Sequence, residues 1–245
     1  MNYDPGPIPA ILDRTRLVYS YTNLNCYENV CPYQFYERYI KKSTPFVETE
    51  AMRYGTKVHE AMEHRIEHKK PLHPDFAQWE PFAAPFDGFH DDTRDKTVPR
   101  QALSTELKLG ITVKGECCDF FDNTNVWLRG KLDVVVLNGF NRAYINDWKT
   151  GNSNYEDRFE LDVGALMLHA ANPVLKKIAG NYVWLKENRL GEMYDLSDTR
   201  HAWTKVTGIV KRIERDRQTG QFEKRPGGLC GWCDVKHCEH NRRKT

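Results

Sequence analysis

The chain has 245 residues, of which 40% are hydrophobic and 12% aromatic, a composition typical of a globular rather than a disordered protein. It has no apolar run of membrane-spanning length, and its first residues lack the basic region and apolar core of a signal peptide. The net charge is +2, but residues 201–245 hold 11 Lys and Arg against 5 Asp and Glu, which suits a polyanion. We expect one domain over residues 1–245, located in the cytoplasm, or in the host cytoplasm if the protein is viral.

The first hundred residues predict two helices and a long connection. Residues 1–19 are expected to form a loosely held arm. Aromatic and apolar residues at helical spacing predict a helix over Pro32–Ile40. A longer helix is predicted over Glu48–Lys69, and its expected inner stripe is Ala51, Tyr54, Val58, Ala61, Met62 and Ile66. Residues 71–100 contain five prolines and predict an irregular connection with room for a short helix.

The rest of the chain predicts a sheet and two more helices. The strands are expected at Ala102–Leu109, Ile111–Phe121, Val126–Leu137, Arg142–Trp148 and Asn181–Lys186, with Gly191–Tyr194 as a possible further strand. A crossover helix is predicted over Tyr155–Ala171, and an amphipathic helix over Ala202–Arg217 with Trp203, Val206, Ile209, Val210 and Ile213 facing inwards. This order predicts an α/β fold with a central mixed sheet flanked by helices.

Two carboxylates and a lysine stand on neighbouring predicted strands. Asp147 and Lys149 are two residues apart and should share a face, which Asp133 joins if the intervening loop has an odd length. Close carboxylates repel unless a cation lies between them, and Mg²⁺ or Mn²⁺ is the natural occupant. A nearby lysine can stabilise charge that develops on a phosphate. An edge position for the lone Asp remains an alternative explanation of this pattern.

Five motifs in order extend this observation. They are Cys31-Pro32-Tyr33-Gln34-Phe35-Tyr36, Gly55-Thr56-Lys57-Val58-His59, Gly130-Lys131-Leu132-Asp133, Asp147-Trp148-Lys149-Thr150-Gly151, and Cys230 with Cys233 and Cys238. Together they resemble the PD-(D/E)XK nuclease superfamily, in its RecB-like branch. The resemblance implies a restriction-endonuclease-like core over residues 101–195, N-terminal helices over 20–70, and a basic helix with a cysteine cluster over 200–245.

The resemblance also implies roles for individual residues. His59, Asp133 and Asp147 would hold Mg²⁺ or Mn²⁺, and Lys149 would be the catalytic lysine. Glu106 matches a Glu that family members often carry on the preceding strand, although a solvent-facing Glu explains its pattern nearly as well. The crossover helix departs from the family, because Glu160-Leu161-Asp162-Val163-Gly164 stands where Gln-Leu-X-X-Tyr is usual.

Seven cysteines without a secretion signal argue for metal rather than disulfides. The resemblance to AddB and to CRISPR-adaptation nucleases implies a structural [4Fe–4S] cluster on Cys31, Cys230, Cys233 and Cys238. The gap of four residues between the last two is one shorter than we expect in the family. Zinc remains an alternative, with His237 and His240 as further ligands. Cys117 and Cys118 are interpreted as strand core.

These features predict a metal-dependent deoxyribonuclease, an exonuclease acting on DNA ends or single strands in recombination, repair or replication. Its DNA contacts would be Lys205, Lys211, Arg212 and Arg215 on the basic helix. A helicase or another recombination protein is a possible partner, and no membrane is expected. Two alternatives stay open, a catalytically inactive nucleic-acid-binding module and an accessory protein that binds a partner and is stabilised by its metal site.

Overall fold

The computed structural model describes residues 17–44, 47–89, 101–139 and 141–242. The chain divides into two compact units, one from Met1–Val47 with Trp203–Thr245 and the other from Glu48–Ala202. The first unit therefore combines segments from both ends of the sequence. The second contains every strand that is assigned in the described residues.

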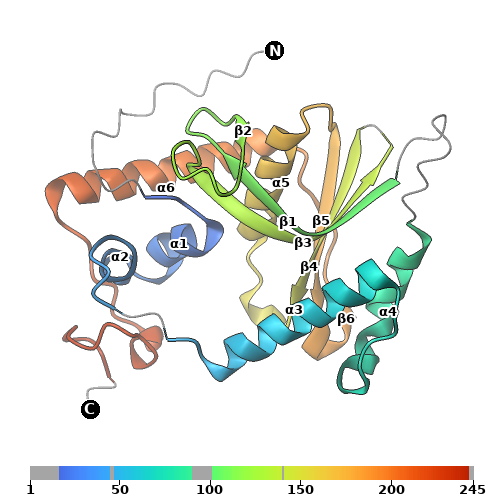
Figure 1. Ribbon diagram of the computed structural model, residues 1–245. Coiled ribbons are helices and arrows are strands. Elements are labelled where there is room, and N and C mark those ends of the chain that lie inside the picture. The colour runs from blue at the N-terminus through green and yellow to red at the C-terminus, as the bar shows by residue number, and fades with distance from the viewer. Residues whose placement is uncertain (1–16, 45–46, 90–100, 140, 243–245) are drawn as a thin grey trace. The chain divides into compact units, whose positions relative to one another are not determined.

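A mixed sheet forms the centre of the second unit (Figure 1). Its strands are β1 (Gln101–Ile111), β2 (Cys117–Cys118), β3 (Leu128–Asn138), β4 (Arg142–Lys149), β5 (Lys177–Trp184), β6 (Arg189–Leu190) and β7 (Tyr194–Asp195). Their order is β2-β1-β3-β4-β5-β6, and β7 also pairs with β5. The pairs β1–β3 and β3–β4 are antiparallel, whereas β4 and β5 are parallel. A parallel pair requires a crossover connection, which here contains α5 (Arg158–Ala171).

Helices cover both faces of this sheet (Figure 1). On one face, α3 (Glu50–His68) packs Val58 and Met62 into a core cluster that also contains Val134 and Val136 of β3. On the other, α5 approaches so closely that a Cβ at Gly164 would lie 2.6 Å from Leu132 Cδ2. The short helix α4 (Glu80–Ala83) completes the α3 face, where Trp79 donates a hydrogen bond to the carbonyl of Leu185. The mixed sheet flanked by helices confirms the predicted fold class.

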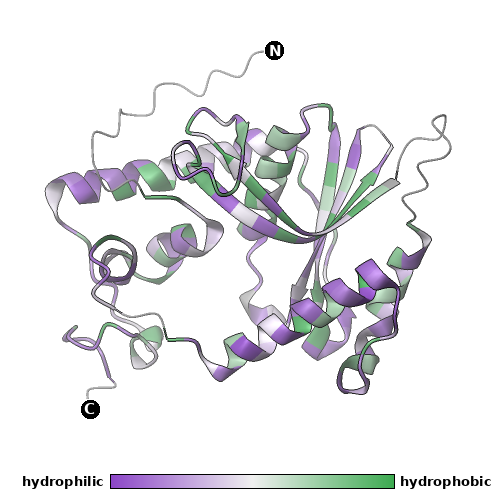
Figure 2. Cartoon of the chain, viewed as in Figure 1, coloured by the Kyte–Doolittle hydropathy of each residue, from purple (hydrophilic) through white to green (hydrophobic). Residues whose placement is uncertain are grey.

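The first unit is helical. It comprises α1 (Tyr21–Asn25), a π-helical turn at Cys26–Val30, α2 (Pro32–Phe35), a π-helical turn at Tyr36–Ile40, and most of α6 (Thr199–Thr219). The predicted inward face of α6 is buried. Both α3 and α6 alternate between hydrophobic and hydrophilic residues along their length, as amphipathic helices do (Figure 2).

Some predicted elements are wrong. Residues 111–121 do not form one strand, because Thr112 and Gly115 close a turn and only Cys117–Cys118 pairs with β1. Cys117 is exposed and Cys118 half-buried, so they are not strand core. Ala51 and Tyr54 are exposed, which shortens the predicted stripe of α3. The connection after α3 contains 3-10 turns at Pro74–Trp79 and Ala84–Gly88 beside α4. The predicted arm over residues 1–19 lies mostly outside the described residues.

Candidate active site

The site begins where β3 and β4 separate. Their paired register ends at Val134 opposite Asn146, one residue before Asp133 and Asp147 would meet. In place of the regular ladder, the backbone N–H of Trp148 donates a hydrogen bond to Asp133 Oδ2 at 2.8 Å. Asp133 is only 6% exposed, so this carboxylate is buried and requires such partners. Its position thus depends on the divergence of two strands.

Glu106 introduces a second irregularity on the neighbouring strand. It has a φ of 48°, in the left-handed region that favours glycine. The strands β1 and β3 pair Thr105 with Val134 and Leu107 with Leu132. Glu106 and Asp133, which lie between these pairs, are not paired in the sheet. Val134 packs into the α3 cluster while Leu132 contacts α5, so the alternation of faces shifts at this point.

The shift brings two carboxylates towards a histidine of α3. The nearest ligand atoms of His59, Glu106 and Asp133 all lie within 4.8 Å of one another. His59 Nδ1 is 3.2 Å from Asp133 Oδ1. In the described part of the chain these residues form the one group of three or more potential metal ligands at this spacing. Imidazole with carboxylates is a donor set that fits Mn²⁺ or Mg²⁺.

Lys149 lies between two carboxylates beside this group. Its Nζ is 2.7 Å from Asp147 Oδ2 and 2.7 Å from Glu160 Oε2 of α5. The ring of Tyr182 supports the ammonium group from 5.2 Å, and its hydroxyl donates to the carbonyl of Asp157. Lys149 therefore contacts α5, whereas Asp133 contacts α3. Asp147 and Lys149, which were expected to share a face, are in contact with each other, and Asp133 is in contact with His59.

The charges of the site shift its pKa values. Burial raises the pKa of Asp147, and the neighbouring Asp133 and Glu160 raise it further, against the lowering effect of Lys149. Burial alone would lower the pKa of Lys149, but the charges of Asp147 and Glu160 outweigh it and raise that pKa. Burial also opposes the charged form of His59, yet the hydrogen bond and charge of Asp133 raise its pKa. These charges therefore favour the protonated form of Lys149.

Sequence reasoning did not place Glu160 or Tyr182 in the site. The sequence showed Glu160 only as a departure from the family motif. In the structure Glu160 accepts a hydrogen bond from Lys149. No sequence signal pointed to Tyr182, which lies on the parallel strand opposite Asp147. Both contacts depend on the crossover through α5.

The four predicted cluster cysteines are brought together in the first unit. Cys31, Cys230, Cys233 and Cys238 all line one small pocket. Two backbone amides approach their sulfurs, from Arg225 to Cys31 Sγ at 3.5 Å and from Gly227 to Cys230 Sγ at 3.3 Å. The cysteine-bearing segment is also held by Asp234, which accepts hydrogen bonds from Gln34 and Arg38 at 2.9 and 2.6 Å.

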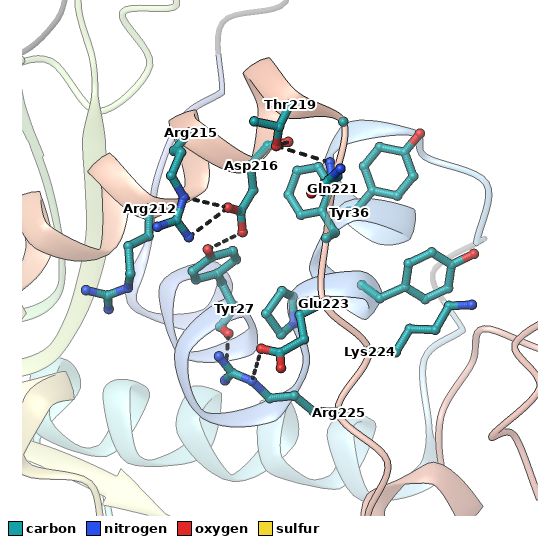
Figure 3. A pocket seen from close by; sticks show the side chains of 14 residues that line it. Tyr27, Tyr36, Arg212, Arg215, Asp216, Thr219, Gln221, Glu223, Lys224 and Arg225 are labelled. Atoms are coloured by element: carbon teal, nitrogen blue, oxygen red, sulfur yellow. Dashed lines mark hydrogen bonds and ion pairs between the residues drawn. The ribbon is translucent and has the colours of Figure 1, made fainter.

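The predicted DNA-binding residues lie on α6 with different surroundings. Lys211 and Arg215 are exposed, and Lys205 and Arg212 are half-buried. Arg212 pairs with Glu28, and Arg215 pairs with Asp216 at 3.0 Å. Arg212 and Arg215 also line a pocket of about 740 Å³, where Tyr27 donates a hydrogen bond to Asp216 (Figure 3). Part of the positive charge of α6 is thus neutralised locally.

Comparisons with known proteins agree with this architecture. The "Putative exonuclease" from Eubacterium rectale is 13% identical and superposes with a TM-score of 0.52, covering 93% of this chain and 89% of that chain. This similarity concerns the fold alone. The structure of SSO0001 is 14% identical over 80% of this chain and 89% of that chain, but its TM-score of 0.38 is too low to support an argument. A comparison with curated proteins finds no match to the sequence.

The family that the sequence matches is one of nucleases, enzymes of the class that hydrolyses phosphodiester bonds. The family model of the PD-(D/E)XK nuclease superfamily matches residues 18–238, and the chain belongs to that superfamily. The matched range includes all of the motifs noted in the sequence. Within the described residues, none of the helices combines the length and the apolar character needed to cross a bilayer.

Proposed function

We propose that the protein is a metal-dependent deoxyribonuclease that acts as an exonuclease. The main supporting observation is the convergence of His59, Glu106 and Asp133 within 4.8 Å, next to the ion pair of Asp147 and Lys149. His59, Asp133 and Asp147 would hold Mg²⁺ or Mn²⁺, with Glu106 as a further ligand. A bound divalent ion would polarise the scissile phosphate and lower the pKa of the attacking water.

The residues around the ion have separable tasks in this proposal. The surrounding charges favour the protonated form of Lys149, so it would stabilise negative charge on the phosphate. Glu160 and Asp147 position its ammonium group from two sides. Trp148, through its backbone N–H, fixes the rotamer of Asp133. The exposed Lys211 and Arg215, with Lys205 and Arg212, would contact the phosphate backbone.

A cleavage assay tests this proposal directly. End-labelled single- and double-stranded DNA, linear and circular, is incubated with Mg²⁺ or Mn²⁺. We expect linear DNA to be degraded from its ends and circular DNA to survive. Asp147→Ala should abolish cleavage, whereas Asp75→Asn, at an exposed carboxylate outside the site, should not affect it. Cutting of circular DNA would contradict exonuclease action, and no cleavage with either metal would contradict the nuclease assignment.

We further propose that Cys31, Cys230, Cys233 and Cys238 hold a structural [4Fe–4S] cluster. All four line one pocket, and two amides point to sulfurs as thiolate ligands require. Zinc on the same thiolates is the alternative occupant, which the metal content of the purified protein distinguishes.

Elemental analysis of anaerobically purified protein tests the cluster. We expect a brown protein with about four irons per chain. Cys230→Ser should lose the colour, whereas Cys117→Ser, at an exposed cysteine of β2, should retain it. One zinc per chain without iron would overturn the iron–sulfur assignment. A role in recombination, repair or replication, with a helicase or recombination protein as partner, completes the proposal.

A further inference from the structure

A row of cations leads away from the candidate metal site along β1 and β3. Lys108 lies directly opposite Lys131, and Gly110 directly opposite Arg129, in the register of these strands. Lys131 forms an ion pair with Glu106, which connects the row to the metal site. Residues two apart in a strand share a face, so Lys108, Lys131 and Arg129 lie on one side of the sheet. Lys131 is the member of this row that contacts the candidate metal site.

Part of this row lies in a groove between α3 and the sheet. The groove has a volume of about 960 Å³ and is lined by Lys69, Lys108 and Lys131 and by the carboxylates of Glu63, Glu67 and Glu106. It belongs entirely to the second unit, which also contains the candidate metal site. A DNA strand whose scissile phosphate is held at Asp133 must continue to one side of that site. The groove includes Glu106, which lies beside Asp133, and it extends along β1 to Lys108, so it offers a course for the strand.

Two phenylalanines stand at the far end of the row. Arg129 lies over the ring of Phe120 at 5.0 Å, and Lys108 lies over the ring of Phe121 at 5.3 Å. The two rings meet edge to face with their centroids 5.0 Å apart. Phe121 is 63% exposed, an unusual position for a large apolar side chain.

The turn that carries these rings is well anchored. Asp119 Oδ1 accepts a hydrogen bond from the backbone N–H of Phe121 at 2.7 Å. The backbone oxygens of Cys118 and Asp119 lie so close to Gly110 that a Cβ there would be 3.2 Å from both. An exposed ring on an ordered turn adds nothing to the stability of the core. Such an arrangement is typical of a surface that binds a ligand.

We propose that this surface binds single-stranded DNA next to the active site. Lys108, Lys131 and Arg129 neutralise phosphates, and Phe121, supported by Phe120, stacks on a base. Aromatic rings combined with cations are the arrangement that single-strand-binding proteins use. A duplex would hide its base faces, so the exposed ring selects single strands. The direction of the strand in this inference rests on the proposed nuclease function. Binding of the strand by the cations and the ring does not depend on cleavage.

Binding measured without divalent metal separates the inference from the proposed function. Fluorescence anisotropy with labelled oligothymidylate and with a duplex of the same length is performed in a chelator, so that no cleavage occurs. Phe121→Ala should weaken single-strand binding about 5- to 100-fold and leave duplex binding unchanged. Phe121→Trp should restore it, whereas Phe121→Leu should not, because stacking needs a flat ring. Val174→Ala, at a valine that is 60% exposed, is the matched control.

The charges are tested by salt dependence. Neutralising Lys108 and Lys131 together should lower the slope of log affinity against log salt by about 1.4, or about 0.7 for each phosphate contact. Lys177→Ala, at an exposed lysine of β5, should leave the slope unchanged.

An unaltered affinity of Phe121→Ala, or an equal loss for duplex and single strand, would overturn the inference. If Phe121→Ala loses binding but the parent protein cleaves no DNA with metal, the proposed nuclease function fails and the binding surface stands.

Discussion

At the scale of single residues, the site is organised around a lysine whose charge is fixed by two carboxylates. Asp147 and Glu160 contact the ammonium group of Lys149 from different elements, β4 and α5. A lysine with a raised pKa cannot act as a general base near neutral pH. In the proposed mechanism its contribution is therefore electrostatic, and it should be large in a buried site.

Removing this charge provides the first prediction. Lys149→Ala should lower kcat by about 10² or more, because a positioned donor for developing charge is lost. DNA affinity measured without metal should change little. Lys177→Ala, at the exposed end of β5, is the control and should retain parental kcat. Near-normal turnover by Lys149→Ala would show that Lys149 is not catalytic.

A buried acid in the first unit gives a prediction for pH. Burial opposes the charge of Glu37, but hydrogen bonds with Ser43, Tyr33, His237 and Lys41 lower its pKa to about 2. A lowered pKa stabilises the folded state above the unfolded value of about 4.3, and this stabilisation is lost as the pH falls towards 2. Acid should therefore weaken the contact between the helical turn at Tyr36–Ile40 and the C-terminal segment.

Glu37→Gln tests this dependence. The variant should lower the free energy of unfolding by about 1–3 kcal/mol at pH 7, because it leaves buried donors unmatched. The difference from the parent should shrink at pH 3. Urea unfolding of the protein as purified, at both pH values, measures it, with Glu48→Gln as the exposed control. A difference that stays constant between the two pH values would contradict the assigned pKa shift.

At the scale of elements, the close contact of α5 with the sheet depends on a glycine. A methyl group at Gly164 would overlap with Leu132, which is itself only 6% exposed and cannot move aside freely. Since α5 also carries Glu160, this packing determines where the partner of Lys149 lies. The helix that closes the parallel crossover thus also positions the site.

Gly164→Ala should destabilise the protein by about 1–3 kcal/mol through overpacking. Gly208→Ala in α6 is the matched control, because the nearest atom to its Cβ would be Arg212 Nη1 at 3.9 Å. That change should be neutral or stabilising by up to about 1 kcal/mol. Thermal unfolding of both variants gives the comparison, and equal melting temperatures would mean that the sheet yields to the added methyl group.

Elements with clear periodicity were predictable from the sequence, and irregular ones were not. The stripe of apolar residues located α3 and α6, and the apolar run before the turn at Asn138-Gly139 located β3. The turn at Thr112–Gly115 was missed, because apolar residues flank it on both sides. The π-helical turn at Tyr36–Ile40 has the same side-chain pattern as an α-helix, so the sequence could not distinguish them.

The candidate site was also predictable only in part from the sequence. Strand spacing alone placed Asp147 beside Lys149, and the family motifs added His59 and Glu106. The left-handed backbone at Glu106 and the contact between Glu160 and Lys149 arise only when β1, β3 and α5 are assembled. Such tertiary contacts leave no local pattern in a single sequence.

At the scale of the whole molecule, the two ends of the chain form one unit around the four cysteines. Cys31 comes from the first of these segments and Cys230, Cys233 and Cys238 from the second. Ligand binding free energy at such a site is folding free energy. The loss of the proposed cluster should therefore affect this unit selectively, while the sheet retains its own core.

Hydrogen exchange of Cys230→Ser provides the measurement. Exchange should accelerate in α1, α2 and the segment after α6, and remain slow in β3, β4 and β5, because these strands carry no cluster ligand. Cys118→Ser serves as the control within the sheet. Equal acceleration in both units would show that the cysteine site stabilises the entire protein.

The left-handed backbone at Glu106 makes the most stable residue at this position different from the residue that the proposed activity needs. A non-glycine residue with a φ of 48° inside a strand costs about 1 kcal/mol or more. Directed evolution that rewards thermal tolerance alone should therefore enrich glycine or asparagine at this position. The same variants would lose a carboxylate beside His59 and Asp133. A single substitution at position 106 should therefore raise thermal stability and lower the nuclease activity at the same time.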